Sequence, residues 1–130
     1  MDKHIKKAQI AIEFVLLVSI SFIILLIFLK AVENQADDLN EKKEFVLVKD
    51  LAYNVQYEIN MATQVKPGYN RTFFMPEKLN NKDYTITKVG NKITIGLKNS
   101  EFTITVPEIN GNITKGNNTI VNIGGVIYLN

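Results

Sequence analysis

The feature that most constrains this chain is a single apolar run near its N-terminus. Between Ile10 and Leu29, only Glu13, Ser19 and Ser21 interrupt 20 residues of otherwise apolar side chains. A helix rises about 1.5 Å per residue, so a helix of this length spans roughly 30 Å, the thickness of the hydrocarbon core of a bilayer. We therefore expect a membrane-spanning helix here and not a piece of a globular core.

Charge is distributed unevenly around this run. Residues 1–8 contain three lysines and one aspartate, whereas the rest of the chain holds 12 basic and 12 acidic residues. Because basic residues flanking a membrane helix stay in the cytoplasm, residues 1–8 are expected inside and everything after Lys30 outside. The run is longer than the apolar part of a secretory signal and no well-formed small-x-small cleavage site follows it, so it should stay attached. The net charge of +2 is too small to favour a nucleic acid partner.

Helical periodicity continues beyond the apolar run. Residues 31–44 are charged but contain no Gly or Pro, and apolar side chains recur at helical spacing at Val32, Ala36, Leu39, Phe45, Val48, Ala52, Val55 and Ile59. This pattern predicts one long helix from near Gln9 to about Val65, where Pro67 and Gly68 stop it. The part of the stripe from Phe45 to Ile59 is interpreted as core packing. A bend or break in the charged middle is left open.

After Gly68 the period changes from helical to alternating. Apolar residues alternate with Thr, Lys and Asn in five short segments, near residues 84–87, 93–95, 102–106, 119–121 and 126–129. Turn sequences rich in Gly and Asn separate these segments, as in an antiparallel sheet of about four to six strands. The fold class expected is therefore α+β: a long N-terminal helix, membrane-spanning in its first half and amphipathic in its second, followed by a small antiparallel β-sheet domain.

The motif at the start of the apolar run carries the functional hypothesis. Residues 6–14 read Lys-Lys-Ala-Gln-Ile-Ala-Ile-Glu-Phe, so that a carboxylate, Glu13, lies inside an apolar helix. An ionisable group in a membrane segment costs a few kcal/mol and is by default a candidate functional group. The segment resembles the archaeal class III signal-peptide type IV pilins, whose precursors carry a short basic leader, then Gln-x-x-x-Glu-Phe, then an apolar helix. The sequence does not resemble the archaellins, because it lacks their glycine-rich start after the cleavage site.

This resemblance implies a processing site and four regions. A membrane-embedded prepilin peptidase would cut between Ala8 and Gln9, removing residues 1–8 as a cytoplasmic leader. The regions that remain are a transmembrane or filament-core helix at 9–30, an amphipathic helix at 31–66 and an antiparallel β-sheet head domain at 67–130. Glycine often precedes the cut in this family, and Ala8 departs from that pattern in a way that could slow processing.

The resemblance also gives Glu13 and Phe14 a role in assembly. Cleavage creates a positive amine at Gln9, four residues before Glu13 and on the same helix face. In related pilins, such a glutamate is thought to neutralise the amine of a neighbouring subunit. The alternative is a protonated or snorkelling carboxyl group near the membrane edge.

Three Asn-x-Thr sequons follow in the predicted outer domain, at Asn70, Asn112 and Asn117. They are candidate N-glycosylation sites in an exported domain. Since about one or two sequons are expected by chance in a chain with this much Asn and Thr, three is a mild excess.

Enzyme signatures are missing from the sequence. The chain has no cysteine, its one histidine is His4, and no Gly-rich phosphate loop or Gly-x-Ser-x-Gly motif occurs. Asp37 and Asp38 are adjacent, and adjacent residues on a helix do not face each other, so a solvated charged face is the better reading. We expect no catalytic residues, no metal site and no cofactor.

The function expected is that of a structural subunit, a major or minor pilin of an archaeal type IV adhesion pilus. Its partners would be the prepilin peptidase and copies of itself or related pilins, with the membrane holding the precursor and a surface filament holding the product. The first rival is a surface binding module or adhesin on a single-pass anchor that does not polymerise. The second is an anchored enzyme.

Overall fold

The computed structural model describes the backbone of residues 2–130 and the side chains of residues 6–130. The predicted leader is therefore only partly covered, and the side chain of His4 lies outside the described residues. One helix and seven strands follow one another along the chain: α1 (Asp2–Gln64), β1 (Asn70–Met75), β2 (Thr85–Val89), β3 (Lys92–Leu97), β4 (Ser100–Thr105), β5 (Ile109–Gly111), β6 (Gly116–Ile123) and β7 (Val126–Leu129). The chain divides into two compact units, residues 1–39 and 40–130.

Helix α1 is longer at its N-terminus than the sequence predicted. It begins at Asp2 and not near Gln9, because no Gly or Pro interrupts the basic segment that precedes the apolar run. Residues 30–44 are helical throughout, which answers the open question about a break. The C-terminus agrees with the prediction: the helix ends at Gln64, and Gly68 adopts a positive φ of 99°, a conformation that excludes further helix.

The first unit is helical, and every side chain described in it, from residue 6 to residue 39, is exposed. The large apolar side chains between Ile10 and Leu29 are 38% to 66% exposed. The two serines of this segment satisfy themselves locally, since Ser19 Oγ donates to the Val15 carbonyl and Ser21 Oγ to the Leu17 carbonyl. By length and composition this helix can cross a membrane. Such a segment needs either lipid or another protein surface around it.

The second unit contains two sheets. In the four-stranded sheet the strand order is β1-β6-β7-β5, and in the three-stranded sheet it is β2-β3-β4. All pairs are antiparallel except β5 with β7, which run parallel. The α+β fold class is confirmed, although the strands number seven in two sheets and exceed the four to six expected. The two strands that the sequence did not predict are β1 and β5.

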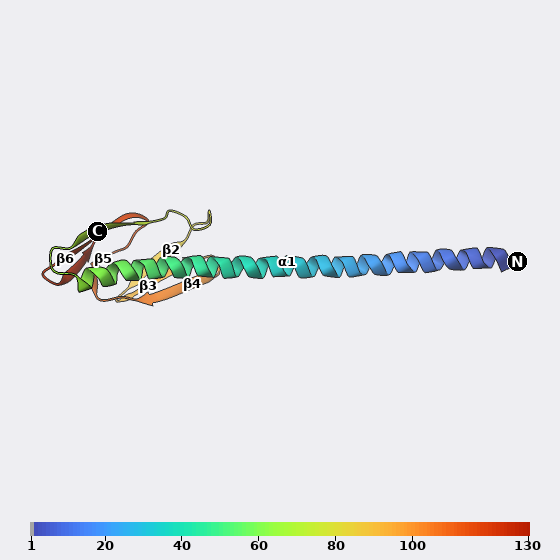
Figure 1. Ribbon diagram of the computed structural model, residues 1–130, viewed down its shortest axis with the longest axis horizontal. Coiled ribbons are helices and arrows are strands. Elements are labelled where there is room, and N and C mark those ends of the chain that lie inside the picture. Colours follow the sequence, from blue (N-terminus) through green and yellow to red (C-terminus); the bar gives the residue numbers. More distant parts are fainter. Residues whose placement is uncertain (1) are drawn as a thin grey trace. The chain divides into compact units, whose positions relative to one another are not determined.

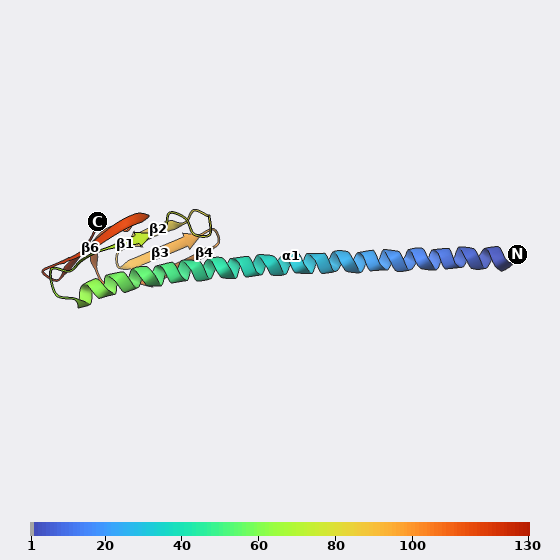
Figure 2. The same ribbon diagram turned by 45° about the horizontal axis from the view of Figure 1, so that its top comes forward.

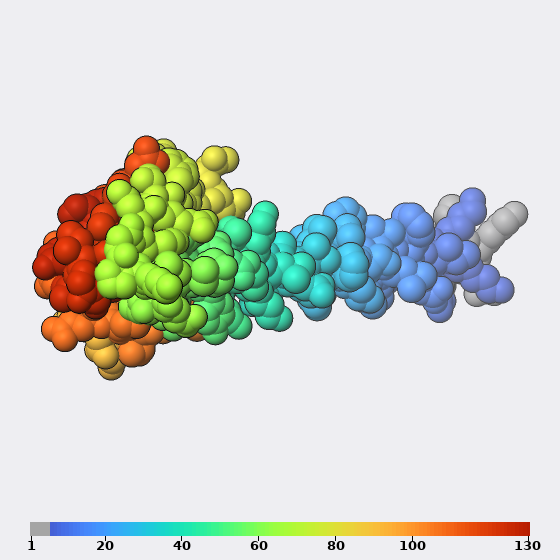
Figure 3. All heavy atoms as spheres, turned by 60° about the vertical axis from the view of Figure 1, so that its left-hand side comes forward, coloured from blue at the N-terminus to red at the C-terminus, as the bar shows by residue number. Residues whose placement is uncertain are grey.

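A single core joins the helix to both sheets, and Figures 1 and 2 show the C-terminal part of α1 alongside β3 and β4. The buried helix positions include Val48, Ala52, Val55 and Ile59, which confirms this part of the predicted stripe. They pack with strand residues in one hydrophobic cluster that includes Ile93, Ile95, Leu97, Ile104, Ile120, Ile127 and Leu129. Figure 3 shows the green helical residues packed among the strand residues of this unit.

The N-terminal part of the predicted stripe does not belong to this core. Phe45 is 41% exposed, and Val32 and Leu39 are also exposed. Phe45 instead forms an edge-to-face contact with Phe102 of β4 at the border of the core, with ring centroids 6.0 Å apart. Spacing alone cannot show this difference, because it gives the face of a helix and not the point at which the sheets stop covering it.

The end of α1 is held by a residue from the far end of the chain. Asn122 on β6 is buried, and its Nδ2 donates to the carbonyls of Ala62 (2.9 Å) and Val65 (3.2 Å). Its Oδ1 accepts from the Gly125 amide at 2.9 Å. Carbonyls in the last turn of a helix lack partners within the helix, so this side chain replaces the water that they would otherwise need.

Candidate functional site

The predicted processing segment lies on an exposed helical surface. Ala8 and Gln9 are both exposed, and the peptide bond between them lies within the continuous helix. Proteases generally act on extended backbone, and the turns of this helix are closed by hydrogen bonds to residues four positions away. A peptidase acting at this bond would therefore have to open at least one turn.

The structure brings Gln9 and Glu13 together on one face of the helix. Gln9 Nε2 donates to Glu13 Oε1 at 3.3 Å, and both residues are exposed. Phe14, the next residue, projects among the exposed apolar side chains of the run. A polar pair and an aromatic side chain thus lie at the N-terminal end of the apolar run.

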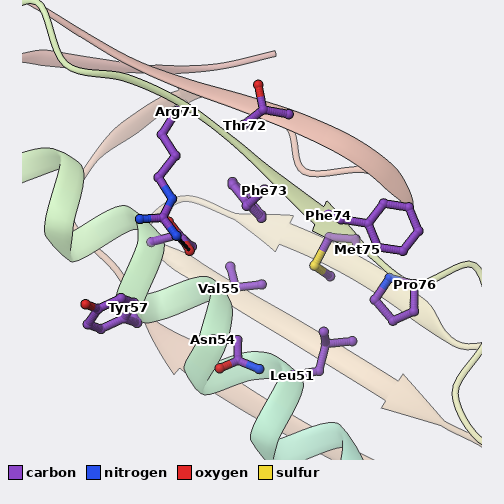
Figure 4. Close-up of a pocket in the computed structure, with 11 residues that line it drawn as sticks. Leu51, Asn54, Val55, Tyr57, Arg71, Thr72, Phe73, Phe74, Met75 and Pro76 are labelled. Atoms are coloured by element: carbon purple, nitrogen blue, oxygen red, sulfur yellow. Dashed lines mark ion pairs between the residues drawn. The ribbon is translucent and has the colours of Figure 1, made fainter.

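A groove in the second unit was not foreseen from the sequence. It has a volume of about 480 Å³ and is lined by helix residues Leu51, Asn54, Val55, Tyr57 and Glu58 and by residues 71–76 of and just after β1 (Figure 4). The side chains of a strand point alternately to the two faces of its sheet, yet six consecutive residues of this segment line the groove. The groove must therefore follow the free edge of β1. That edge is free because β1 is the outermost strand of its sheet.

One ion pair lies in this groove. Glu58 Oε1 is 3.0 Å from Arg71 Nη2, drawn as a dashed line in Figure 4. The neighbouring Tyr69 hydroxyl, together with the Glu58 carboxylate, raises the pKa of the Arg71 guanidinium. Glu58 Oε2 and the Tyr69 hydroxyl are buried and have no hydrogen-bond partner among the described residues.

The groove contains groups that can bind a ligand, but it has no evident set of catalytic groups. It offers an apolar floor, a carboxylate, a guanidinium and a strand edge, and among the residues with described side chains no histidine, cysteine or serine lines it. Within residues 6–130, no three His, Cys, Asp or Glu side chains gather closely enough to hold a metal ion. Sequence reasoning missed the groove because Phe73 and Phe74 are adjacent, which breaks the alternation by which strands are recognised.

All three sequon asparagines, Asn70, Asn112 and Asn117, are exposed. The structure places two of these asparagines on paired strands. Asn70 and Asn117 lie on the paired strands β1 and β6, whereas Asn112 follows β5. The hydroxyls of Thr72 and Thr119, the third residues of the sequons at Asn70 and Asn117, are 3.3 Å apart.

Comparison with known proteins adds no assignment, since no family model, curated protein or solved structure matches this chain.

Proposed function

We propose that this protein is the precursor of a type IV pilin-like filament subunit. In this proposal the precursor is held in the membrane by the apolar part of α1, with residues 1–8 in the cytoplasm and the sheet domain outside. A prepilin peptidase cuts between Ala8 and Gln9. The processed chains then leave the bilayer and pack their apolar helices against one another in a surface filament of the archaeal adhesion type.

One observation carries the proposal. An exposed apolar helix continues directly into the helix of a domain that has its own core, and a carboxylate lies near the start of the apolar part. The apolar side chains from Ile10 to Leu29 are exposed, whereas the core of the second unit begins with helix residues near Val48. Lipid covers such a helix before assembly. Helices of other copies cover it equally well in a filament, because they present the same apolar surface.

The Gln9 and Glu13 pair supports the same proposal. A plain membrane anchor gains nothing from a carboxylate in its apolar segment, which costs a few kcal/mol to insert. Cleavage at Gln9 would create a cation four residues away, or about 6 Å along the helix axis. A neighbouring copy displaced by about this rise would place its new amine beside Glu13, which neutralises both charges inside the filament.

A second exposed helix face supports contacts between copies in the outer unit. Val46 and Tyr57 are exposed, and Tyr53 is exposed apart from the side of its ring that contacts Phe102. Val48 and Val55 on the opposite face are buried. A helix that places apolar side chains on both faces has one face for its own core and another for a partner. In the proposed filament that partner is a second copy.

N-terminal and intact-mass analysis of protein from the surface filaments of producing cells tests this function. We expect a mature chain that begins at Gln9. Ala8→Phe should accumulate the precursor in the membrane, whereas Ala8→Gly, the matched control, should be processed at least as fast as the natural chain. A surface protein that begins at Met1, or after Leu29, would show that the proposal is wrong.

The groove beside β1 favours the rival function of an anchored binding module. A cavity with unpartnered polar atoms is a feature of ligand sites as well as of hydrated surfaces. The rival requires neither cleavage nor polymerisation. Uncut monomers that keep residues 1–8 in the membrane of producing cells would favour it over the filament subunit.

A further inference from the structure

The paired strands β1 and β6 have one buried face and one exposed face. Along β6 the buried residues are Asn118, Ile120 and Asn122, whereas Thr119 and Val121 between them are half-buried and Asn117 is exposed. On β1, Met75 is buried and Phe73 half-buried, whereas Phe74 is 64% exposed. The exposed face of the pair is therefore made by Asn70, Thr72 and Phe74 on β1 opposite Val121, Thr119 and Asn117 on β6.

The hydrogen bonds between the strands determine how close these side chains lie. The Asn122 amide donates to the Tyr69 carbonyl at 2.9 Å, so the pair formed by residues 69 and 122 is hydrogen-bonded. Hydrogen-bonded and non-hydrogen-bonded pairs alternate in an antiparallel ladder. Phe74 and Asn117 therefore form a non-hydrogen-bonded pair, in which the Cβ atoms are closest, about 4.5 to 5.5 Å apart.

The sequon at Asn117 presents its two chemical groups on this exposed face. Residues 117 and 119 are two apart on a strand, so the carboxamide of Asn117 and the hydroxyl of Thr119 point the same way. Asn118, between them, points inward and is fully buried. Its Oδ1 accepts from the Thr114 amide at 2.8 Å, and its Nδ2 donates to the Thr114 carbonyl at 2.7 Å. The buried residue thus fixes the strand that displays Asn117.

The surroundings of Asn112 are different. Asn112 lies beyond the last paired residue of β5, so the register gives it no side chain directly opposite within the described residues. The hydroxyl of its sequon threonine, Thr114, accepts from Asn130 Nδ2 at 3.2 Å. Ile113, in the middle of that sequon, is buried. The sequon at Asn117, by contrast, has the exposed Phe74 directly opposite its acceptor asparagine in the strand register.

We propose that Asn117 carries an N-linked saccharide whose first sugar ring packs against the face of Phe74. The acceptor is Asn117 Nδ2, and the co-reactant is a saccharide activated as a phosphate ester. A bond forms between Nδ2 and the anomeric carbon, while the bond from that carbon to the phosphate oxygen breaks. The phosphate leaves with the electron pair of that bond, and Nδ2 loses one proton to a base of the transferase.

The saccharide also accounts for the exposure of Phe74. Sugar rings have one face of C–H groups, and an aromatic ring has an electron-rich face that attracts them. Stacking removes apolar surface of both rings from water. The proposal rests on the proposed function only in that the sheet domain must be exported, because sequons are modified outside the cytoplasm.

Glycopeptide mass mapping of the full-length protein from producing cells is the first test. We expect a saccharide mass on the peptide that contains Asn117. Thr119→Ala should abolish it, and Thr119→Ser, which keeps a hydroxyl at the same position, should retain it. An exported protein with unmodified Asn117 would overturn the proposal.

Thermal unfolding of the full-length protein in detergent tests the role of Phe74. The natural glycoprotein should unfold about 3 °C above Asn117→Gln, which corresponds to less than 1 kcal/mol for a domain of this size. Phe74→Ala should remove that difference, whereas Val89→Ala should keep it, since Val89 is 71% exposed on β2, a strand of the other sheet. If the difference persists in Phe74→Ala, the stacking is refuted even when the saccharide is present.

The outcomes separate this proposal from the filament function. A chain that is cut at Gln9 and found in filaments, but carries no saccharide at Asn117, removes the proposal alone. A chain with the saccharide that never polymerises removes the filament function alone.

Discussion

The carboxylate of Glu44 on α1 forms an ion pair with the ammonium of Lys82, 38 residues later in the chain. The Glu44 side chain is only 6% exposed, whereas that of Lys82 is 44% exposed. The pair ties the connection between β1 and β2 to the helix, near the point where the core begins.

Lys82→Met should destabilise the second unit by about 2 kcal/mol, because a buried carboxylate left without its partner keeps its full desolvation cost. Chemical denaturation of the full-length protein in detergent measures this change. Lys82→Arg is the matched control: it keeps a cation beside the buried Glu44 carboxylate and should cost less than about 0.5 kcal/mol. Equal losses in the two variants would contradict the burial argument.

From the environment of Tyr84 we predict that the second unit loses stability at high pH. Burial, with a smaller contribution from the charge of Glu77, raises the pKa of Tyr84 from 10.0 to about 12. The folded chain therefore holds the phenol proton more tightly than the unfolded chain does. The stability that this provides is complete below pH 10 and is lost as the pH rises through about 12.

A pH series of denaturation midpoints, with tyrosinate absorbance measured in parallel, checks this prediction. Tyr84→Phe should flatten the alkaline decline, because it has no proton to lose. It should also be less stable at neutral pH, since the hydroxyl donates to the Pro76 carbonyl and that acceptor would lose its partner. An unchanged alkaline decline would show that other groups cause it.

Asn122→Ala should fray the end of α1. The change leaves the carbonyl of Ala62 without its donor in a buried setting, which costs about 1 to 3 kcal/mol. Amide hydrogen exchange should accelerate in residues 60–65 more than in residues 48–55. Asn91→Ala, at an exposed position in the turn between β2 and β3, is the control. Uniform acceleration along the helix would indicate general destabilisation and no specific capping role.

Glu13→Gln should separate membrane insertion from filament assembly. Without the carboxylate, the new amine of a neighbour would be buried unpaired, at a cost of about 3 to 5 kcal/mol that residual water would reduce. Insertion should be unchanged or improved, because an amide is cheaper to insert than a charge. Electron microscopy of filaments, with membrane levels of the processed subunit as the control, gives the result. Normal filament numbers would remove the assembly role of Glu13.

The sequence predicted those helix and strand positions at which apolar residues recur with a regular spacing. The helical period places Val48 and Val55 on the core face, and alternation predicts strands such as β3, in which Ile93 and Ile95 are buried. The alternation of apolar and polar residues cannot be seen in the sequence of β1, because Phe73 and Phe74 are adjacent apolar residues whose side chains point to opposite faces of the sheet. Strand β5 is only three residues long, Ile109–Gly111, which is too short to show any period.

Contacts between distant residues were beyond the reach of the sequence. Glu44 reads as one more charge in a charged segment, and only the position of Lys82 explains its burial. Asn122 reads as a polar residue in a strand, although it holds a helix end 60 residues earlier. The candidate processing and assembly residues could be named because they form one local motif. The groove beside β1 could not, since its two sides come from different elements.

The separation along α1 between the exposed apolar run and the part that packs in the core has an evolutionary consequence. No residue of the described core precedes Val48, and no residue of the apolar run belongs to that core. Substitutions before residue 30 therefore leave the free energy of unfolding of the sheet domain nearly unchanged, and substitutions in the sheets leave the apolar surface of the run untouched. Selection can change what the domain displays to its surroundings while the apolar run stays the same.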